Sequence, residues 1–189
     1  RCHAGRSGGR TVARGGCVNS TPDPAPMAAL DAIVHAARVF LESRWPAWHR
    51  RWGPPHPACA SQWTCIRSSL FVRKVLGQVG IGATIASGVP NARERCGFFD
   101  GVSWNSHAWV RTAGAIVDVT AHQFSAADVI ITPISDSRYR AGLQPDARLS
   151  GGQSAIAAVD AIWPDWIEET GSARYSALQI RPGTAHRRR

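Results

Sequence analysis

The 189-residue chain contains no run of apolar residues approaching the roughly 18–20 that a transmembrane helix needs. It also lacks the apolar segment of a secretory signal near its N-terminus. We therefore expect no membrane span and a cytoplasmic location. A hydrophobic content of 44% and a charged content of 19% exclude collagen-like, coiled-coil and wholly disordered proteins. A single globular domain of ordinary size is what this composition predicts.

The cysteines and histidines lack the spacing of a metal site. The five cysteines stand at positions 2, 17, 59, 65 and 96, an odd and irregular set that does not predict a disulfide framework. Suitable ligand types for zinc do occur, at His56, Cys59, Cys65, Cys96 and His107. No Cys-x-x-Cys or paired histidine motif joins them, however, and structural zinc sites usually have one. We expect no metal and no other cofactor.

The chain has little charge imbalance outside its two ends. Its formal net charge is +9, of which +3 belongs to residues 1–26 and +4 to residues 181–189. Residues 27–180 hold only +2 and show no basic stripe. A basic tail can touch RNA or acidic lipid without specificity, so we predict no specific nucleic-acid partner.

The composition also predicts the domain boundaries. Residues 1–26 are rich in Gly, Arg, Ser, Thr and Pro, and we expect them to be a disordered basic tail. The only methionine, Met27, stands where the apolar pattern begins, so the stretch before it is interpreted as possibly not native. Residues 27–180 are expected to form one domain, and residues 181–189 a second disordered basic tail.

Periodicity and turn residues predict a mixture of helices and strands. The expected helices are 28–44, ended by Trp45-Pro46, then 65–79, closed by Gly80, and a weaker one over 154–169 that breaks at Pro164. The expected strands are 81–89, the hairpin pair 106–110 and 115–120, and 129–131. An irregular loop over 90–104 is expected just before the hairpin, where it could line a substrate groove.

Cys65 opens the clearest helix and is the candidate nucleophile. Ser61 and Thr64 precede it and are plausible helix caps. The positive end of the helix dipole and the first-turn amides favour a thiolate over a thiol. Those amides also lie beside any oxyanion that develops on a carbonyl attacked by the sulfur.

His107 and Asp118 are the candidate base and its orienting carboxylate, because the hairpin pattern places them on facing strands. A loop over 111–114 predicts that His107 lies directly opposite Asp118, with Cβ atoms about 4.5–5.5 Å apart. A carboxylate in that position would hold the imidazole tautomer and stabilise its charged form. Both residues would be costly to bury in such apolar strands unless they satisfied each other.

Each residue alone has a structural interpretation. A cysteine on an apolar helix is usually a small core residue, a histidine beside tryptophan is often a core residue with satisfied hydrogen bonds, and an aspartate near a strand end is usually a turn residue. The three together favour catalysis.

Four further residues each have a functional and a structural interpretation. Gln62 is a candidate donor to the oxyanion, for which backbone amides are the alternative donors. Trp109 either forms a wall of the site or is a core residue. Asn105 and Gln123 either support the His107 and Asp118 pair or form hydrogen bonds within their loops.

These residues also carry a family resemblance. The runs that carry it are Cys65-Ile-Arg-Ser-Ser-Leu70 through Gly80, Ser106-His-Ala-Trp-Val110, and Ile116-Val-Asp-Val-Thr120 with Gln123-Phe124. Together they resemble the transglutaminase-like branch of the papain-like cysteine enzymes. The bacterial members are most similar, among them the leader peptidases of lasso-peptide biosynthesis. The resemblance covers about residues 60–131. It implies an α+β fold with a papain-like core, in which a Cys at a helix N-terminus packs on an antiparallel sheet carrying His and Asp.

The resemblance implies acyl transfer by a Cys65, His107 and Asp118 triad through a thioester. Peptidase, deamidase and transglutaminase activity remain open within it, and the substrate is expected to be a peptide or protein. A leader peptidase would also need a separate peptide-recognition partner protein. The alternative is a non-catalytic peptide-binding module on the same fold.

Overall fold

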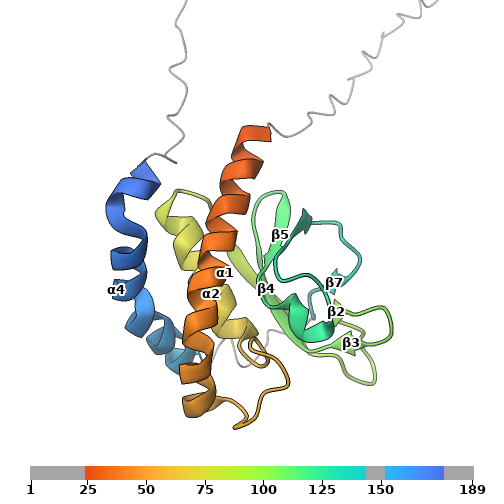
Figure 1. Cartoon of the computed structure of the whole chain (residues 1–189). Coiled ribbons are helices and arrows are strands. Elements are labelled where there is room, and N and C mark those ends of the chain that lie inside the picture. The colour runs from red at the N-terminus through yellow and green to blue at the C-terminus, as the bar shows by residue number, and fades with distance from the viewer. Residues whose placement is uncertain (1–23, 144–151, 177–189) are drawn as a thin grey trace, which may run out of the picture.

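The computed structural model describes residues 24–143 and 152–176, which form helices on one side and antiparallel sheets on the other (Figure 1). The helices are α1 (Pro24–Trp52), α2 (Cys65–Gln78), α4 (Gln153–Ser176) and the short 3₁₀ helix η1 (Ala121–Phe124). The strands are β1 (Thr84–Gly88), β2 (Gly97–Phe99), β3 (Trp104–Asn105), β4 (His107–Arg111), β5 (Ala115–Asp118), β6 (Ile130–Pro133) and β7 (Tyr139–Arg140). The α+β class predicted from the sequence is confirmed.

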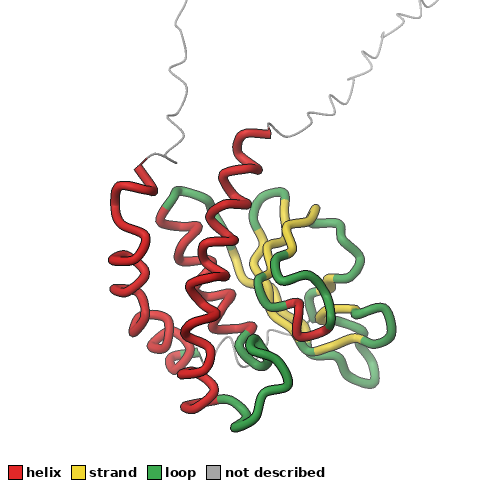
Figure 2. The backbone as a smooth tube through the Cα atoms, viewed as in Figure 1, coloured by secondary structure: helices red, strands yellow, loops and turns green. Residues whose placement is uncertain are grey.

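The strands form two sheets. The larger has the order β1-β4-β5-β6 and the smaller the order β3-β2-β7, with antiparallel pairing between neighbours in both. Helix α2 contacts β4, α1 and α4, so it lies between the larger sheet and the other two long helices. Figure 2 shows the long helices gathered on one side of the strands, with only the short helix η1 among them. This places the first turn of α2 next to the strands that carry the histidine and the aspartate.

The larger sheet has an apolar core on each face, as the period-two alternation of its strands requires. Val110 and Val117 join the helical core, whose largest buried side chains include Trp45, Phe71 and Trp166. On the other face a second core forms against the smaller sheet and the loop with η1. Its buried members are Ala86, Phe98, Trp109, Ile116, Ala121, Ile130 and Tyr139.

Two helices continue through prolines at which the sequence predicted an end. Helix α1 contains Pro46 and runs on to Trp52. Helix α4 contains Pro164 and continues beyond it to Gly171, whose φ of 58° and ψ of 144° kink the element before its end at Ser176. Proline removes one helical hydrogen bond, but buried tryptophans close to each proline, Trp45 and Trp166, hold the chain in place. Tertiary packing therefore overrides the local signal. Within the described ranges no helix is long and apolar enough to cross a membrane.

Helix α1 begins at Pro24, two residues before the end of the expected tail at residue 26, and Met27 lies inside it. The rest of the predicted N-terminal tail, residues 1–23, and the predicted tail 181–189 lie outside the described residues. The expected loop over 90–104 is corrected. It contains strands β2 and β3, whose two or three residues are too short for a periodic signal.

Gly88 and Gly97 allow the two sheets to approach each other. A Cβ on Gly88 would lie 2.2 Å from the backbone nitrogen of Gly97. A Cβ on Gly97 would lie 2.0 Å from the carbonyl oxygen of Asn105, and the φ angle of Gly97 is +99°, a region that side chains disfavour. The contact matters for the site because Phe98, the next residue, packs against His107.

We predict opposite effects on stability from two glycine-to-alanine substitutions. Gly97→Ala should lower the free energy of unfolding by at least about 1–3 kcal/mol, because it combines a steric clash with a disfavoured φ. Gly77→Ala, at an exposed position of helix α2 with open space around its Cβ position, should raise it by roughly 0.5–1 kcal/mol. Urea unfolding measures both. Equal stability of the two variants would contradict the steric and conformational constraint at Gly97.

Candidate active site

Cys65 is the first residue of α2, as predicted, and is 6% exposed. The predicted caps do not form. Thr64 occupies the N-cap position without a side-chain capping bond, and its Oγ1 donates instead to the carbonyl of Ser61 at 2.7 Å. The first turn of α2 also contains no acidic residue. The positive end of the helix dipole is therefore not offset by the helix's own side chains at the sulfur.

His107 is the first residue of β4 and is fully buried. Its Nε2 lies 2.6 Å from Oδ2 of Asp118. Three aromatic rings surround the imidazole, with centroids 5.1 Å away for Phe124, 5.9 Å for Phe98 and 6.2 Å for Trp109. This packing fixes the orientation of the ring and shields its bond to Asp118 from water.

The predicted direct opposition of His107 and Asp118 is wrong by two residues. Val110 pairs with Val117 and Arg111 with Ile116, so continuation of the register places Asp118 opposite Trp109. The cause is the turn, in which Thr112 exchanges backbone and side-chain hydrogen bonds with Ala115 and thereby displaces the expected loop. A shift of two residues keeps both side chains on one face, and diagonal neighbours remain within reach.

Asp118 accepts hydrogen bonds at both carboxylate oxygens. Oδ1 accepts from the backbone N–H of Thr120 at 2.8 Å and from its Oγ1 at 3.1 Å. Oδ2 accepts from Oη of Tyr139 at 2.9 Å, besides its contact with His107. Sequence reasoning missed both donors. The Asp-x-Thr spacing is a local signal that could have found Thr120, whereas nothing near Asp118 in the chain indicates Tyr139.

Interactions among the three candidate triad residues shift the pKa values of His107 and Asp118 towards their charged forms. Burial lowers the pKa of His107, but the charge and hydrogen bond of Asp118, together with a side-chain hydrogen bond and the charge of Cys65, outweigh burial and raise the pKa to about 10. For Asp118, burial raises the pKa, but the charge and hydrogen bond of His107 outweigh it and keep the pKa below its usual value. Because Nε2 faces Asp118, Nδ1 is the ring nitrogen left for the sulfur. The positively charged form of His107 is therefore favoured.

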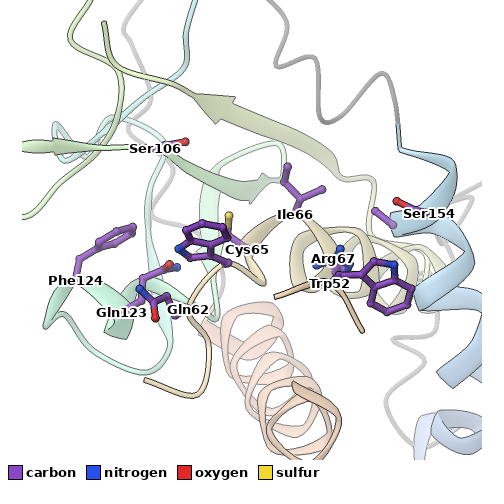
Figure 3. Close-up of a pocket in the computed structure, with 11 residues that line it drawn as sticks. Trp52, Gln62, Cys65, Ile66, Arg67, Ser106, Gln123, Phe124 and Ser154 are labelled. Atoms are coloured by element: carbon purple, nitrogen blue, oxygen red, sulfur yellow. The ribbon is translucent and has the colours of Figure 1, made fainter. Parts of the chain in front are cut away.

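Cys65 opens into a pocket of about 640 Å³. Figure 3 shows Gln62, Gln123 and Phe124 on one side of the cysteine and Trp52, Arg67 and Ser154 on the other. The complete lining is Trp52, Gln62, Trp63, Cys65, Ile66, Arg67, Ser106, Gln123, Phe124, Ser154 and Ala155. Helices α1, α2 and α4, the segment before α2, Ser106 before β4, and η1 all contribute. Cys65, the candidate nucleophile, therefore lines a space that can admit a ligand.

Two of the four further predicted residues line this pocket and two do not. Gln62 is held by a bond from the backbone N–H of Ala58 to its Oε1 at 2.7 Å, which leaves Nε2 as its donor. Gln123 lines the pocket and donates from Nε2 to the carbonyl of Thr120 at 2.9 Å. Asn105 instead donates to Asp100 and Ser103 in the β2–β3 turn. Trp109 is a core residue that contacts the His107 ring.

A polar network unforeseen from the sequence supports the segment after Asp118. Arg38 of α1, 5% exposed, donates to the carbonyls of Val119 and Asp128 and to Nδ1 of His122. Its Nε is paired with Glu42 at 2.7 Å. Burial, and then the charge of Arg38, lower the pKa of His122. The guanidinium thus fixes the chain between β5 and β6, from which Gln123 and Phe124 reach the pocket.

This geometry is supported neither by a metal site among the described residues nor by similarity to a known protein. Across residues 24–143 and 152–176, no group of three or more His, Cys, Asp or Glu side chains is arranged to hold a metal ion. Comparison of the chain with protein-family models, with curated proteins and with solved structures finds no match in any of the three. The chemistry is therefore argued from the side chains themselves.

We predict that His107 carries a positive charge at pH 8 while His122 is neutral. The raised pKa of His107 and the lowered pKa of His122 place them on opposite sides of that pH. Nitrogen NMR of ¹⁵N-histidine-labelled protein, assigned by substitution, measures both rings. The stabilisation from the His107 charge should be complete below its unfolded pKa of about 6.5 and lost as the pH rises towards 10. A neutral His107 ring at pH 8 would contradict the ion pair.

We predict that Tyr139→Phe destabilises the protein through Asp118. Removal of one donor from a buried carboxylate should lower the free energy of unfolding at pH 7 by about 1–3 kcal/mol. Since the hydrogen bond from Tyr139 helps to lower the pKa of Asp118, the loss should shrink as the pH falls through this lowered pKa and the carboxylate is protonated. Urea unfolding at pH 7 and across the acidic range measures this. A loss independent of pH would assign Tyr139 to packing alone.

Proposed function

We propose that the protein is a cysteine-dependent amide hydrolase or acyltransferase of the transglutaminase-like type, with Cys65 as nucleophile. One observation carries the proposal: a fully buried His107 interacts with both the Asp118 carboxylate and the Cys65 side chain. A purely structural histidine in an apolar core would be more stable neutral, because burial disfavours its charge. Here two anionic partners keep the charge, and one of them lines a pocket.

In the first half of the reaction, the Cys65 thiolate attacks the carbonyl carbon of an amide. A carbon–sulfur bond forms, and the carbonyl electron pair moves to oxygen. The first-turn amides of α2 and Nε2 of Gln62 are the donors available to that oxyanion. The carbon–nitrogen bond then breaks as the His107 imidazolium transfers its proton to the departing nitrogen, which leaves as an amine or ammonia. A thioester on Cys65 remains.

In the second half, water or an amine attacks the thioester carbonyl. Neutral His107 accepts a proton from this attacking group, while Asp118 stabilises the imidazolium that forms again. The carbon–sulfur bond breaks, and the thiolate is restored. Water gives hydrolysis, as in a peptidase or deamidase, and an amine gives transfer. The same three side chains serve all of these outcomes.

A peptide or protein amide suits the pocket as substrate. Trp63, at the pocket rim, is 67% exposed, and its backbone has the positive φ of 63°, a conformation disfavoured for a bulky residue. An exposed aromatic side chain beside a nucleophile offers an apolar surface for a bound chain. Phe124 provides a second aromatic wall beyond Cys65 (Figure 3).

We predict selective alkylation of Cys65 by iodoacetamide at pH 7. Cys65 should react much faster than Cys96, which is buried and whose pKa burial raises, and faster than Cys59. Asp118→Asn, which keeps the shape of the side chain but removes its charge, should slow the reaction at least about tenfold. Mass spectrometry of digested protein gives the rate at each cysteine. Similar rates at all three cysteines would remove the basis of the mechanism.

A turnover assay distinguishes the proposed enzyme from the alternative, a non-catalytic peptide-binding module of the same fold. With p-nitrophenyl acetate as acyl donor, an acid quench should trap an acetyl thioester on Cys65, and p-nitrophenol release should continue past one equivalent. Cys65→Ala should form no adduct at that position and His107→Gln should release far less product, with folding checked by circular dichroism. Alkylation of Cys65 without acylation or turnover would favour the binding module.

A further inference from the structure

Arg67 is a cation in the candidate active-site pocket without an acidic partner. It is half-buried, two residues after Cys65, and its Nε is shut off from solvent without a hydrogen-bond partner. None of the ion pairs between described residues includes it. Burial lowers the pKa of Arg67, and the charge of Cys65 acts against this, so the guanidinium lies within the field of the sulfur. A half-buried cation of this kind favours an anion beside it.

Trp52 gives this end of the pocket a flat aromatic surface against which guanidinium groups stack. The guanidinium carbon of Arg67 lies 4.7 Å from the centroid of the Trp52 ring, and that of Arg51 lies 4.6 Å from it. Stacking on an aromatic ring holds a guanidinium in a defined plane while its terminal N–H groups stay available. Arg67 is therefore oriented before any ligand arrives.

Two helix N-termini meet at the same pocket. Cys65, Ile66 and Arg67 are the first residues of α2, while Ser154 and Ala155 belong to the first turn of α4. Neither helix has an acidic residue in its first turn. The described pocket lining contains no Asp or Glu at all. Helix dipoles and guanidinium therefore add to a positive potential at one end of the space that holds the nucleophile.

We infer that Arg67 is a specificity-determining residue that binds a carboxylate of the substrate, next to the acyl group that Cys65 attacks. This rests on the proposed function and names the substrate class for it: peptides with an anionic group close to the reacting amide. The planar guanidinium fits a carboxylate through paired N–H donors. The carboxylate can belong to an Asp or Glu side chain or to a chain terminus. Figure 3 shows Arg67 and Trp52 on the side of Cys65 away from Phe124, which leaves the end with Phe124, Gln62 and Gln123 for the rest of the ligand.

Three matched electrophiles test the inference. They are N-bromoacetyl-glutamine amide, which is neutral, N-bromoacetyl-glutamate amide, with a side-chain carboxylate, and N-bromoacetyl-glutamine, with a terminal carboxylate. Each alkylates Cys65 by displacement of bromide by the sulfur. The full chain should react with one or both anionic reagents about tenfold faster than with the neutral one, after correction for their intrinsic reactivity towards free cysteine. The faster anionic reagent identifies the source of the carboxylate.

Three variants test whether Arg67 causes the faster reaction of the anionic reagents. Arg67→Gln should reduce the anionic-to-neutral rate ratio to within about twofold of one, and Arg67→Lys should retain part of it because a point charge remains. Arg73→Gln makes the same change of charge at an exposed position of α2 outside the pocket and should keep the full ratio. A ratio near one in the unmodified chain, or one that Arg67→Gln leaves unchanged, would overturn the inference. Failure of the proposed function is distinguishable, because Cys65 would then react no faster than Cys59 with any of the reagents.

Discussion

The contact between the buried His107 imidazolium and the Asp118 carboxylate is the constraint on which the rest of this structure depends. Burial of either charge alone is strongly unfavourable, and even a pair is stable only when its remaining hydrogen-bonding atoms are satisfied. Thr120 and Tyr139 supply donors to the carboxylate, and Cys65 supplies the second partner of the imidazole. The small sheet, the 3₁₀ helix and the first turn of α2 must therefore all converge on one point.

The helices meet this requirement from the opposite face of the sheet. Ser69 of α2 donates to the carbonyl of Ala108 at 3.1 Å, which ties the helix of the nucleophile to the strand of the histidine. Trp45 of α1 donates from its indole nitrogen to Ser68 at 3.1 Å and is fully buried. Arg38, also in α1, holds the chain just after Asp118. Helix α1 thus positions both sides of the site without lining its centre.

The parts that were predictable from sequence are those with a local cause. The helix beginning at Cys65 and the hairpin of His107 and Asp118 follow from apolar periodicity, and the three polar residues stand out because strands and helices of that kind rarely carry them. That the three side chains lie close together could be proposed for the same reason. The hairpin register was wrong because a single side chain, Thr112, sets the turn. The passage of α1 and α4 through Pro46 and Pro164 could not be predicted, since distant packing decides it.

Tyr139 and Arg67 show two different limits of sequence reasoning. Tyr139 reaches Asp118 only because β7 pairs with β2, and that pairing leaves no periodic signal in strands of two or three residues. Arg67 lies in the run that carries the family resemblance. Its proposed role depends on the lack of Asp and Glu among the described residues that line the pocket. Such an absence becomes visible only once α1 and α4 are placed beside it.

The wide separation along the chain of the residues that converge on Asp118 has a consequence for biosynthesis. Cys65 is synthesised well before His107, and Tyr139 later still, so a nascent chain carries the thiol long before its activating partners exist. Contacts of such long range form late, because the loops that join them must close first. In an incomplete or partly folded chain, Cys65 therefore lacks the buried imidazole and carboxylate that surround it in the folded structure. That environment is complete only once the short strand β7 docks on β2 and brings Tyr139 to Asp118.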